Sequence, residues 1–413
     1  MNNYSNREPL PPIRRSSSTD ISYRRNSEQR QTKPKNTPKR ASRNVNTKVK
    51  YKGQIDYVIL LCVILLVAIG IIMVFSSSYY TAGQGENADM YAFLKKDTVY
   101  AAIGFVAMYF VSRIDYEILK PFIKPLYFGS ILLLLLVFTP LGVVHNGARR
   151  WLNFGFEFQP SEIAKFALII TLAAMLENNP KMLDSWGGVL KYLGIMILPT
   201  GIVAMENLST AIVIGGISVV LLFVYSPKLR YPVSIGIAGM AAVLSLVFLS
   251  WRSDRVTAWL HPETVANEKG FQVLQSLYSV ASGGMFGLGI GGSRQKMGYM
   301  PEAQNDIIFA IICEELGWFG AAIVVTLFIV LIWRGIYIAI RNSNEPFAML
   351  LATGITSMIA IQVMINIAVV TNTIPNTGIP LPFISYGGTS LVMMLASMGL
   401  LMNISRYHGK NKE

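Results

Sequence analysis

Long apolar runs separated by short polar stretches dominate the chain after residue 52. A helix needs about 20 apolar residues to cross a bilayer, and fewer where neighbouring helices cover its ends. Ten runs meet this requirement, at residues 57–78, 98–112, 123–144, 160–176, 189–205, 208–225, 233–250, 307–333, 347–371 and 381–404. The pattern predicts an all-α polytopic membrane protein with about ten transmembrane helices.

The composition supports this fold class. Of the 413 residues, 52% are hydrophobic and only 14% are charged, which lies outside the range of soluble globular domains. The two cysteines, Cys62 and Cys313, both lie within apolar runs. A disulfide framework and a thiolate metal site are therefore excluded as the basis of the fold or the function.

Residues 1–52 form a basic, polar segment of a different kind. They carry fourteen Lys and Arg side chains against three acidic ones, so they hold +11 of the chain's formal charge of +13. A segment with so few apolar residues cannot bury enough surface to fold. We expect a disordered cytoplasmic tail that attracts anionic membrane lipids and fixes the orientation of the chain in the membrane. We expect no nucleic-acid partner.

The charge pattern also predicts how the chain is oriented. With the tail inside, the even-numbered connections and residues 408–413 fall in the cytoplasm, and the connections are short and carry Lys or Arg as the positive-inside rule requires. Both termini of the membrane domain, residues 53–407, are then cytoplasmic. The one long extracellular loop is residues 251–306, between the seventh and eighth spans.

Several cations break the positive-inside rule, because they fall on the outer face. They are Arg149, Arg150, Arg252, Arg255, Lys269, Arg294 and Lys296. Outward cations indicate either an anionic ligand or contacts with lipid headgroups. Arg294 and Lys296 follow six glycines within residues 283–292, a stretch whose backbone can turn tightly or approach a ligand closely. We predict that Arg149, Arg150, Arg294 and Lys296 bind substrate.

Carboxylates mark two further segments. Asp306 lies where the long loop enters an apolar run that also holds Glu314 and Glu315, and a charge at the centre of a membrane helix costs about 2.5–3.5 kcal/mol. We expect Glu314 and Glu315 to be structural, hydrogen-bonded to neighbouring helices or protonated. Glu162 and Lys165 share one helix face, so they are either a structural pair or line a cavity with Asp306.

The third polar segment is residues 376–390, which is rich in Pro and Gly and leads into the last span. Irregular backbone at membrane depth is tolerated only where it is buried in protein or lines a cavity. We therefore expect an unwound cavity lining in which Ser385, Thr389 and Ser390 supply hydrogen bonds to substrate.

These three segments together resemble the hallmark motifs of the SEDS family (shape, elongation, division and sporulation), which includes FtsW, RodA and SpoVE. The matching stretches read NGARRW…QPSEIAK, SGGMFGLGIGGSRQKMGYMPEAQNDIIFAIICEELG and TGIPLPFISYGGTS. The resemblance covers about residues 55–407 and favours the FtsW and SpoVE branch. It implies a peptidoglycan glycosyltransferase that polymerises lipid II into undecaprenyl-linked glycan strands in the bacterial cytoplasmic membrane, at the division septum.

The resemblance also implies partners and site residues. The partners are a class B penicillin-binding transpeptidase and other divisome proteins. The family's essential aspartate, in its PEA-x-x-D motif, falls on Asp306, and its cavity Glu and Lys fall on Glu162 and Lys165. One position departs from the family pattern, since Asn207 stands where members often carry an aspartate.

The chemistry of lipid-linked sugars fits a single carboxylate at this site. Glycosidases use two carboxyl groups because the leaving oxygen must be protonated, whereas pyrophosphate leaves as a stable anion. We predict that Asp306 is the general base; its competing role is as a ligand of Mg²⁺ or Mn²⁺, and no organic cofactor is expected. The alternatives are a lipid-precursor flippase or transporter, an elongation polymerase of the RodA type, and a non-catalytic scaffold.

Overall fold

The computed structural model describes residues 51–52, 54–83, 89–145, 148–155, 157–248, 253–265, 269–296 and 303–408. Nearly all of the predicted tail, residues 1–50, lies outside these ranges, as do residues 409–413 at the other end of the chain. Tyr51–Lys52 forms strand β1, which pairs antiparallel with β5, Tyr407–His408. The two ends of the membrane domain are therefore joined to each other.

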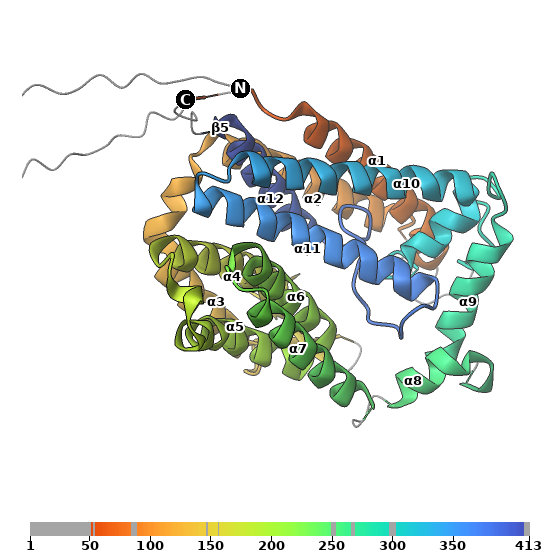
Figure 1. Ribbon diagram of the computed structural model, residues 1–413. Coiled ribbons are helices and arrows are strands. Elements are labelled where there is room, and N and C mark those ends of the chain that lie inside the picture. The colour runs from red at the N-terminus through yellow and green to blue at the C-terminus, as the bar shows by residue number, and fades with distance from the viewer. Residues whose placement is uncertain are drawn as a thin grey trace, which may run out of the picture. The chain divides into compact units, whose positions relative to one another are not determined.

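Each of the ten predicted spans coincides with a helix in the described part of the chain (Figure 1). They are α1 (Tyr57–Ala82), α2 (Ala92–Arg113), α3 (Ile123–Leu136), α4 (Pro160–Asn178), α5 (Trp186–Glu206), α6 (Leu208–Tyr225), α7 (Arg230–Phe248), α10 (Ile308–Arg341), α11 (Pro346–Val370) and α12 (Thr389–Arg406). Among the described residues, seven helices are long and apolar enough to cross a membrane by length and composition. The all-α polytopic prediction is confirmed.

Several predicted boundaries were wrong, because Pro and Gly end helices inside apolar runs. The third span was extended to residue 144, but α3 ends before Pro140 and strands follow. These strands are β2 (Gly142–His145), β3 (Ala148–Asn153) and β4 (Glu157–Phe158), which form one antiparallel sheet in that order. The last span was begun at residue 381, but α12 begins at Thr389, after a Pro- and Gly-rich approach that is not helical.

Shorter helices fill the remaining connections. The predicted extracellular loop is partly ordered, since it contains α8 (Ser253–Leu260), a 3-10 turn at Pro262–Val265 and α9 (Lys269–Ser282). Two further 3-10 segments, Tyr116–Phe122 and Met182–Asp184, precede α3 and α5. Glu157 in β4 and Arg255 in α8 both line the cavity described below, so these connections supply walls of the site.

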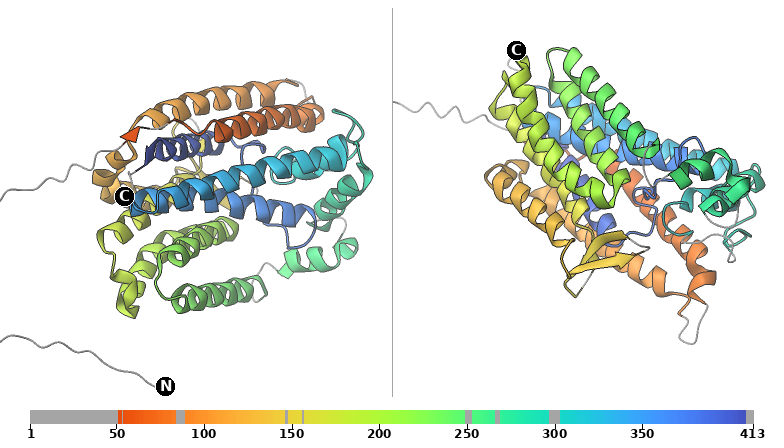
Figure 2. Two further views of the ribbon diagram at one scale, coloured as in Figure 1. Left: turned by 45° about the horizontal axis from the view of Figure 1, so that its top comes forward. Right: turned by 90° about the horizontal axis from the view of Figure 1, so that it is seen from below.

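The helices pack around α10 and α11, which lie next to each other. On one side α1 contacts α10 and α2 packs along α12; on the other side α4 and α6 contact α11 (Figures 1 and 2). Glycines permit close approach of α2 and α12, since a Cβ at Gly104 would overlap Leu395 and one at Gly399 would overlap the backbone of Met108. Close packing at small residues is a common way in which membrane helices associate.

Helix α10 is broken at Gly317, where φ is 68° and ψ is −170°. The glycine-rich stretch after α9 packs against this break. The Leu288 N–H donates to the Glu314 carbonyl at 2.9 Å, and the Trp318 N–H donates to the Gly284 carbonyl at 3.0 Å. The loop thus supplies backbone partners where the helix cannot. The glycines serve close packing here, since a Cβ at Gly287 would overlap the Glu315 carbonyl.

Gly317→Ala is expected to lower the thermal unfolding midpoint of the purified protein. A non-glycine residue in this backbone region costs about 1–3 kcal/mol, and the alanine Cβ would also overlap the Met285 carbonyl. Gly194→Ala is the matched control, because a Cβ at Gly194, within α5, has no neighbour within 4 Å. Equal midpoints for the two variants would contradict the packing role assigned to Gly317.

Candidate active site

A cavity of about 790 Å³ lies among the segments that the sequence singled out. Glu162 and Lys165 of α4, Asp306, and Thr389 and Ser390 of α12 all line it. The cavity is further walled by β3, β4, α6, α8, α9 and α11. Helices and strands that are far apart in the sequence therefore meet at one polar cavity within an otherwise apolar helix bundle.

Asp306 lies in the turn that enters α10, two residues before the helix begins. The turn places its side chain just ahead of the helix, at the cavity. The Asp306 carbonyl accepts a hydrogen bond from Asn366 Nδ2 at 2.6 Å. A Cβ built on Gly378 would lie 3.6 Å from Asp306 Oδ2, so the carboxylate faces the irregular segment before α12 across a narrow gap.

Glu162 and Lys165 form an ion pair at the wall of the cavity. Lys165 Nζ lies 2.9 Å from Glu162 Oε1, and the two side chains are only 1% and 8% exposed. Pro160 at the first turn of α4 places both residues on one turn of the helix, and pairing offsets the cost of burying the charges. Ser390 Oγ donates to Glu162 Oε2 at 3.1 Å, which ties α12 to α4. The pair is structural and also lines the cavity with Asp306.

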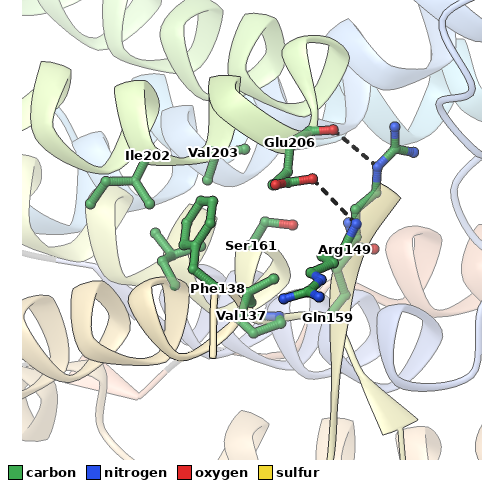
Figure 3. Close-up of a pocket in the computed structure, with 11 residues that line it drawn as sticks. Val137, Phe138, Arg149, Gln159, Ser161, Ile202, Val203 and Glu206 are labelled. Atoms are coloured by element: carbon green, nitrogen blue, oxygen red, sulfur yellow. Dashed lines mark hydrogen bonds between the residues drawn. The ribbon is translucent and has the colours of Figure 1, made fainter. Parts of the chain in front are cut away.

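The neighbouring arginines of β3 are placed differently. Arg150 lines the cavity and also borders a smaller pocket next to it, and its Nε donates to the Glu206 carbonyl at 3.2 Å. Arg149 does not line the cavity; it borders the smaller pocket with Gln159 and Ser161, and its backbone N–H donates to Glu206 Oε2 at 3.2 Å (Figure 3). The pairing of β3 with β2 shifts register here, since Val143 pairs with Trp151 and Val144 with Arg149, and a bulge of this kind redirects side chains. The structure therefore brings only Arg150 to the cavity.

Lys296 and Arg294, both predicted to bind substrate, do not line the cavity either. Lys296 is 5% exposed, and its Nζ lies 2.6 Å from Glu315 Oε1 and 2.9 Å from Ser76 Oγ of α1. The Arg294 backbone N–H donates to Glu314 Oε1 at 2.9 Å. Both residues anchor the glycine-rich loop to α10. Glu314 and Glu315 have the structural, hydrogen-bonded roles that the sequence predicted.

Ser385 is a further correction to the predicted site. Its Oγ accepts a hydrogen bond from the Leu381 N–H at 2.7 Å, and its own N–H donates to the Leu381 carbonyl at 3.0 Å. Ser385 closes a turn of the unwound segment and does not line the cavity. Thr389 and Ser390 do line it, as predicted.

Asn207 also lines the cavity, although it departs from the family pattern. Its Oδ1 accepts a hydrogen bond from the Thr210 N–H at 3.1 Å. Asparagine is one of the preferred residues at a helix N-terminus. The side chain therefore caps α6, a role that needs no negative charge.

Two polar residues at the site, one on the cavity wall and one behind Asp306, were not predicted from the sequence. Arg255 of α8 lines the cavity, and its Nη1 donates to the Asn376 carbonyl at 3.1 Å. Its position among the cations on the outer face was the sequence feature that could have identified it. Asn366 of α11 is 1% exposed and contacts Asp306 through its amide. For Asn366, the sequence feature that could have identified it was an amide side chain within an apolar span.

The charged side chains around the cavity are balanced in number. Arg150, Lys165 and Arg255 face Glu157, Glu162 and Asp306. A guanidinium carries five N–H donors, so Arg150 and Arg255 can bind an anion in the cavity beside the backbone carbonyls that they already contact. A carboxylate and guanidinium groups in one partly enclosed site can take up a proton and stabilise developing negative charge.

The described residues do not by themselves form a metal centre. No group of three or more His, Cys, Asp and Glu side chains in the described ranges lies close enough to hold an ion. Mg²⁺ is commonly bound by one or two carboxylates together with substrate phosphates. A divalent cation at this cavity would therefore need ligands from the substrate.

Comparisons with known proteins agree with the fold and the motifs. The family model for FtsW, RodA and SpoVE, described as "Cell cycle protein", matches residues 56–410. Stage V sporulation protein E of Bacillus subtilis (strain 168) is 43% identical over 357 residues, which cover 85% of this chain and 97% of that protein. A protein of Geobacter sp. (strain M18) named "Probable peptidoglycan glycosyltransferase FtsW" is 37% identical, with coverage of 85% and 96%.

Solved structures extend the similarity. A chain from a peptidoglycan synthase complex that coordinates polymerization and crosslinking aligns with a TM-score of 0.70 at 26% identity, covering 85% of this chain and 98% of that chain. The rod shape determining protein RodA of Thermus thermophilus aligns with a TM-score of 0.63 at 25% identity, covering 85% and 97%. This chain is thus a multi-pass membrane protein that belongs to the SEDS family of FtsW, RodA and SpoVE.

Proposed function

We propose that this chain is a peptidoglycan glycosyltransferase that polymerises lipid II at the outer face of the cytoplasmic membrane during cell division. The observation that carries the proposal is the cavity, which joins Asp306 to Arg150 and Arg255 beside the paired Glu162 and Lys165. Relatives that carry the glycosyltransferase name in full-length alignments support the same activity.

The reaction that we propose is a displacement at the anomeric carbon of one lipid-linked sugar. An acceptor hydroxyl forms the new C–O bond as the bond from that carbon to pyrophosphate breaks, and Asp306 takes the hydroxyl proton. The lipid pyrophosphate leaves with the bonding electron pair as a stable anion. Arg150 and Arg255 would neutralise it in a site where fixed cations act more strongly than in water.

Substrate contacts follow from the lining residues. Thr389 and Ser390 at the start of α12 would hydrogen-bond the sugars, and the Glu162–Lys165 pair would hold the wall that carries Ser390.

The divalent cation expected from the sequence remains part of the proposal. It would bind together with the pyrophosphate, and no reaction step is assigned to it. Comparing strand synthesis in Mg²⁺, Mn²⁺ and EDTA tests that part.

The proposed partner is a class B penicillin-binding transpeptidase, together with other division proteins at the septum. A structurally similar chain belongs to a synthase complex that couples polymerization to crosslinking, which supports such a partnership. An elongation role of the RodA type is the alternative for the cellular process. The septal role has support from the similarity to FtsW in sequence.

Incubating the purified chain with lipid II in detergent tests the activity, with and without a cognate transpeptidase. Glycan strands that grow with time are the expected product, measured by gel separation of labelled strands. Detergent micelles have no two compartments, so a flippase would give no product. Absence of strands under all conditions, with transfer of lipid II across vesicle membranes, would favour the transporter alternative.

A further inference from the structure

Asn366 is a buried amide near the C-terminal end of the apolar helix α11. It is 1% exposed, and its Nδ2 group donates two hydrogen bonds, to the Asp306 carbonyl at 2.6 Å and to the Ile379 carbonyl at 2.8 Å. These two carbonyls come from different segments of the chain. A single side chain thus joins the turn that carries Asp306 to the irregular segment before α12.

Neither of the joined segments is part of a helix or a strand. Asp306 lies in a turn, and residues 374–380 have no helix or strand assignment of any kind. Gly378, next to Ile379, has a φ of 70° and faces Asp306 Oδ2, where an added Cβ would lie 3.6 Å away. Two contacts tie this segment to the turn that carries Asp306. One is the Asn366 amide, and the other is the hydrogen bond from the Tyr386 N–H to the Gln304 carbonyl.

The Asn366 amide is only partly satisfied. Its Oδ1 is buried and has no hydrogen-bond partner, which costs stability. The opposite amide orientation would direct the oxygen at two carbonyl oxygens, so the two carbonyls fix the orientation that is seen. A buried polar atom without a partner calls for an explanation, and here the amide that carries it contacts the backbone of Asp306.

We infer that Asn366 is a positioning residue, which holds the Asp306 backbone so that the carboxylate faces Gly378 and the cavity. The inference rests on the proposed function, because it gives the place of Asp306 a catalytic purpose. Asn366 itself touches backbone carbonyls, so it acts on the reaction only through the position of Asp306. A misplacement of about 1 Å at a reacting group can lower a rate about 100-fold.

The test is Asn366→Leu, a substitution of similar size that removes both donated hydrogen bonds. In strand synthesis from lipid II we expect kcat to fall about 100-fold while KM for lipid II stays close to that of the wild type. The thermal midpoint should fall less than in the control below, because the unpartnered Oδ1 is removed together with the donors.

Asn403→Leu is the matched control, on α12 away from the cavity. Asn403 is also buried, but its Nδ2 donates to the Ser112 carbonyl at 3.0 Å and its Oδ1 accepts from the Tyr116 N–H at 3.2 Å. This variant should lose more stability and keep the wild-type kcat. Wild-type kcat in Asn366→Leu, or equal losses of kcat in both variants, would overturn the positioning role. Failure of the wild type to make strands would instead refute the proposed function.

Discussion

Asp306→Asn is expected to lower the rate of glycan-strand synthesis about 10²–10⁴-fold, the range that a positioned general base contributes. Asparagine has nearly the same shape and keeps the backbone bond to Asn366, but it cannot take up the proton of the acceptor hydroxyl. The loss should appear in kcat, because the pocket and its guanidinium groups stay in place. Initial rates of strand growth on purified lipid II measure it.

Asp89→Asn is the control for this substitution. Asp89 is an exposed carboxylate that pairs with Lys95 at 2.9 Å in the connection between α1 and α2, so its loss should leave the rate unchanged. The thermal midpoint of Asp306→Asn should also differ from that of the wild type by no more than the midpoint of Asp89→Asn does. Strand synthesis by Asp306→Asn at the wild-type rate would refute the assignment of the base.

The apolar runs predicted the helices well because the membrane imposes both their length and their composition. The polar segments also identified part of the cavity, since Glu162, Lys165, Asp306, Thr389 and Ser390 all line it. Each lies where a run of apolar residues is interrupted. An interruption is costly in a membrane protein, so it is a local signal of a site.

The wrong predictions of site residues have a different physical origin. They depend on how distant parts of the chain fold against each other, which the local sequence does not indicate. Lys296 was expected to meet substrate, but its partner is Glu315, nineteen positions further on, and only the folding of the glycine-rich loop onto α10 brings them together. Arg149 and Arg150 looked equivalent in a predicted loop. They lie in a β-strand at a shift in its pairing register with β2, and such a bulge, which redirects side chains, cannot be read from the sequence.

The buried ion pair of Lys296 and Glu315 gives the second prediction, which concerns stability. Lys296→Met is expected to destabilise the protein by about 3–5 kcal/mol, because it leaves a buried carboxylate without its cation. The Glu315 side chain is 0% exposed, and its remaining polar partners are Ser76 Oγ at 2.7–2.8 Å and the Ser293 N–H at 3.3 Å. Unfolding of the detergent-solubilised protein, followed by circular dichroism, measures the change.

Two further variants separate the effect of burial from the loss of a lysine. Lys120→Met breaks a pair with Glu177 whose side chains are 34% and 26% exposed, so it should cost no more than about 1 kcal/mol. Lys296→Met combined with Glu315→Leu removes both charges and should recover much of the lost stability, since apolar replacements of buried pairs are often neutral. If Lys296→Met costs no more than Lys120→Met, the pair does not hold the glycine-rich loop against α10. If the double variant is stable but makes fewer strands, the pair serves the geometry of the loop that leads to Asp306 more than the stability of the fold.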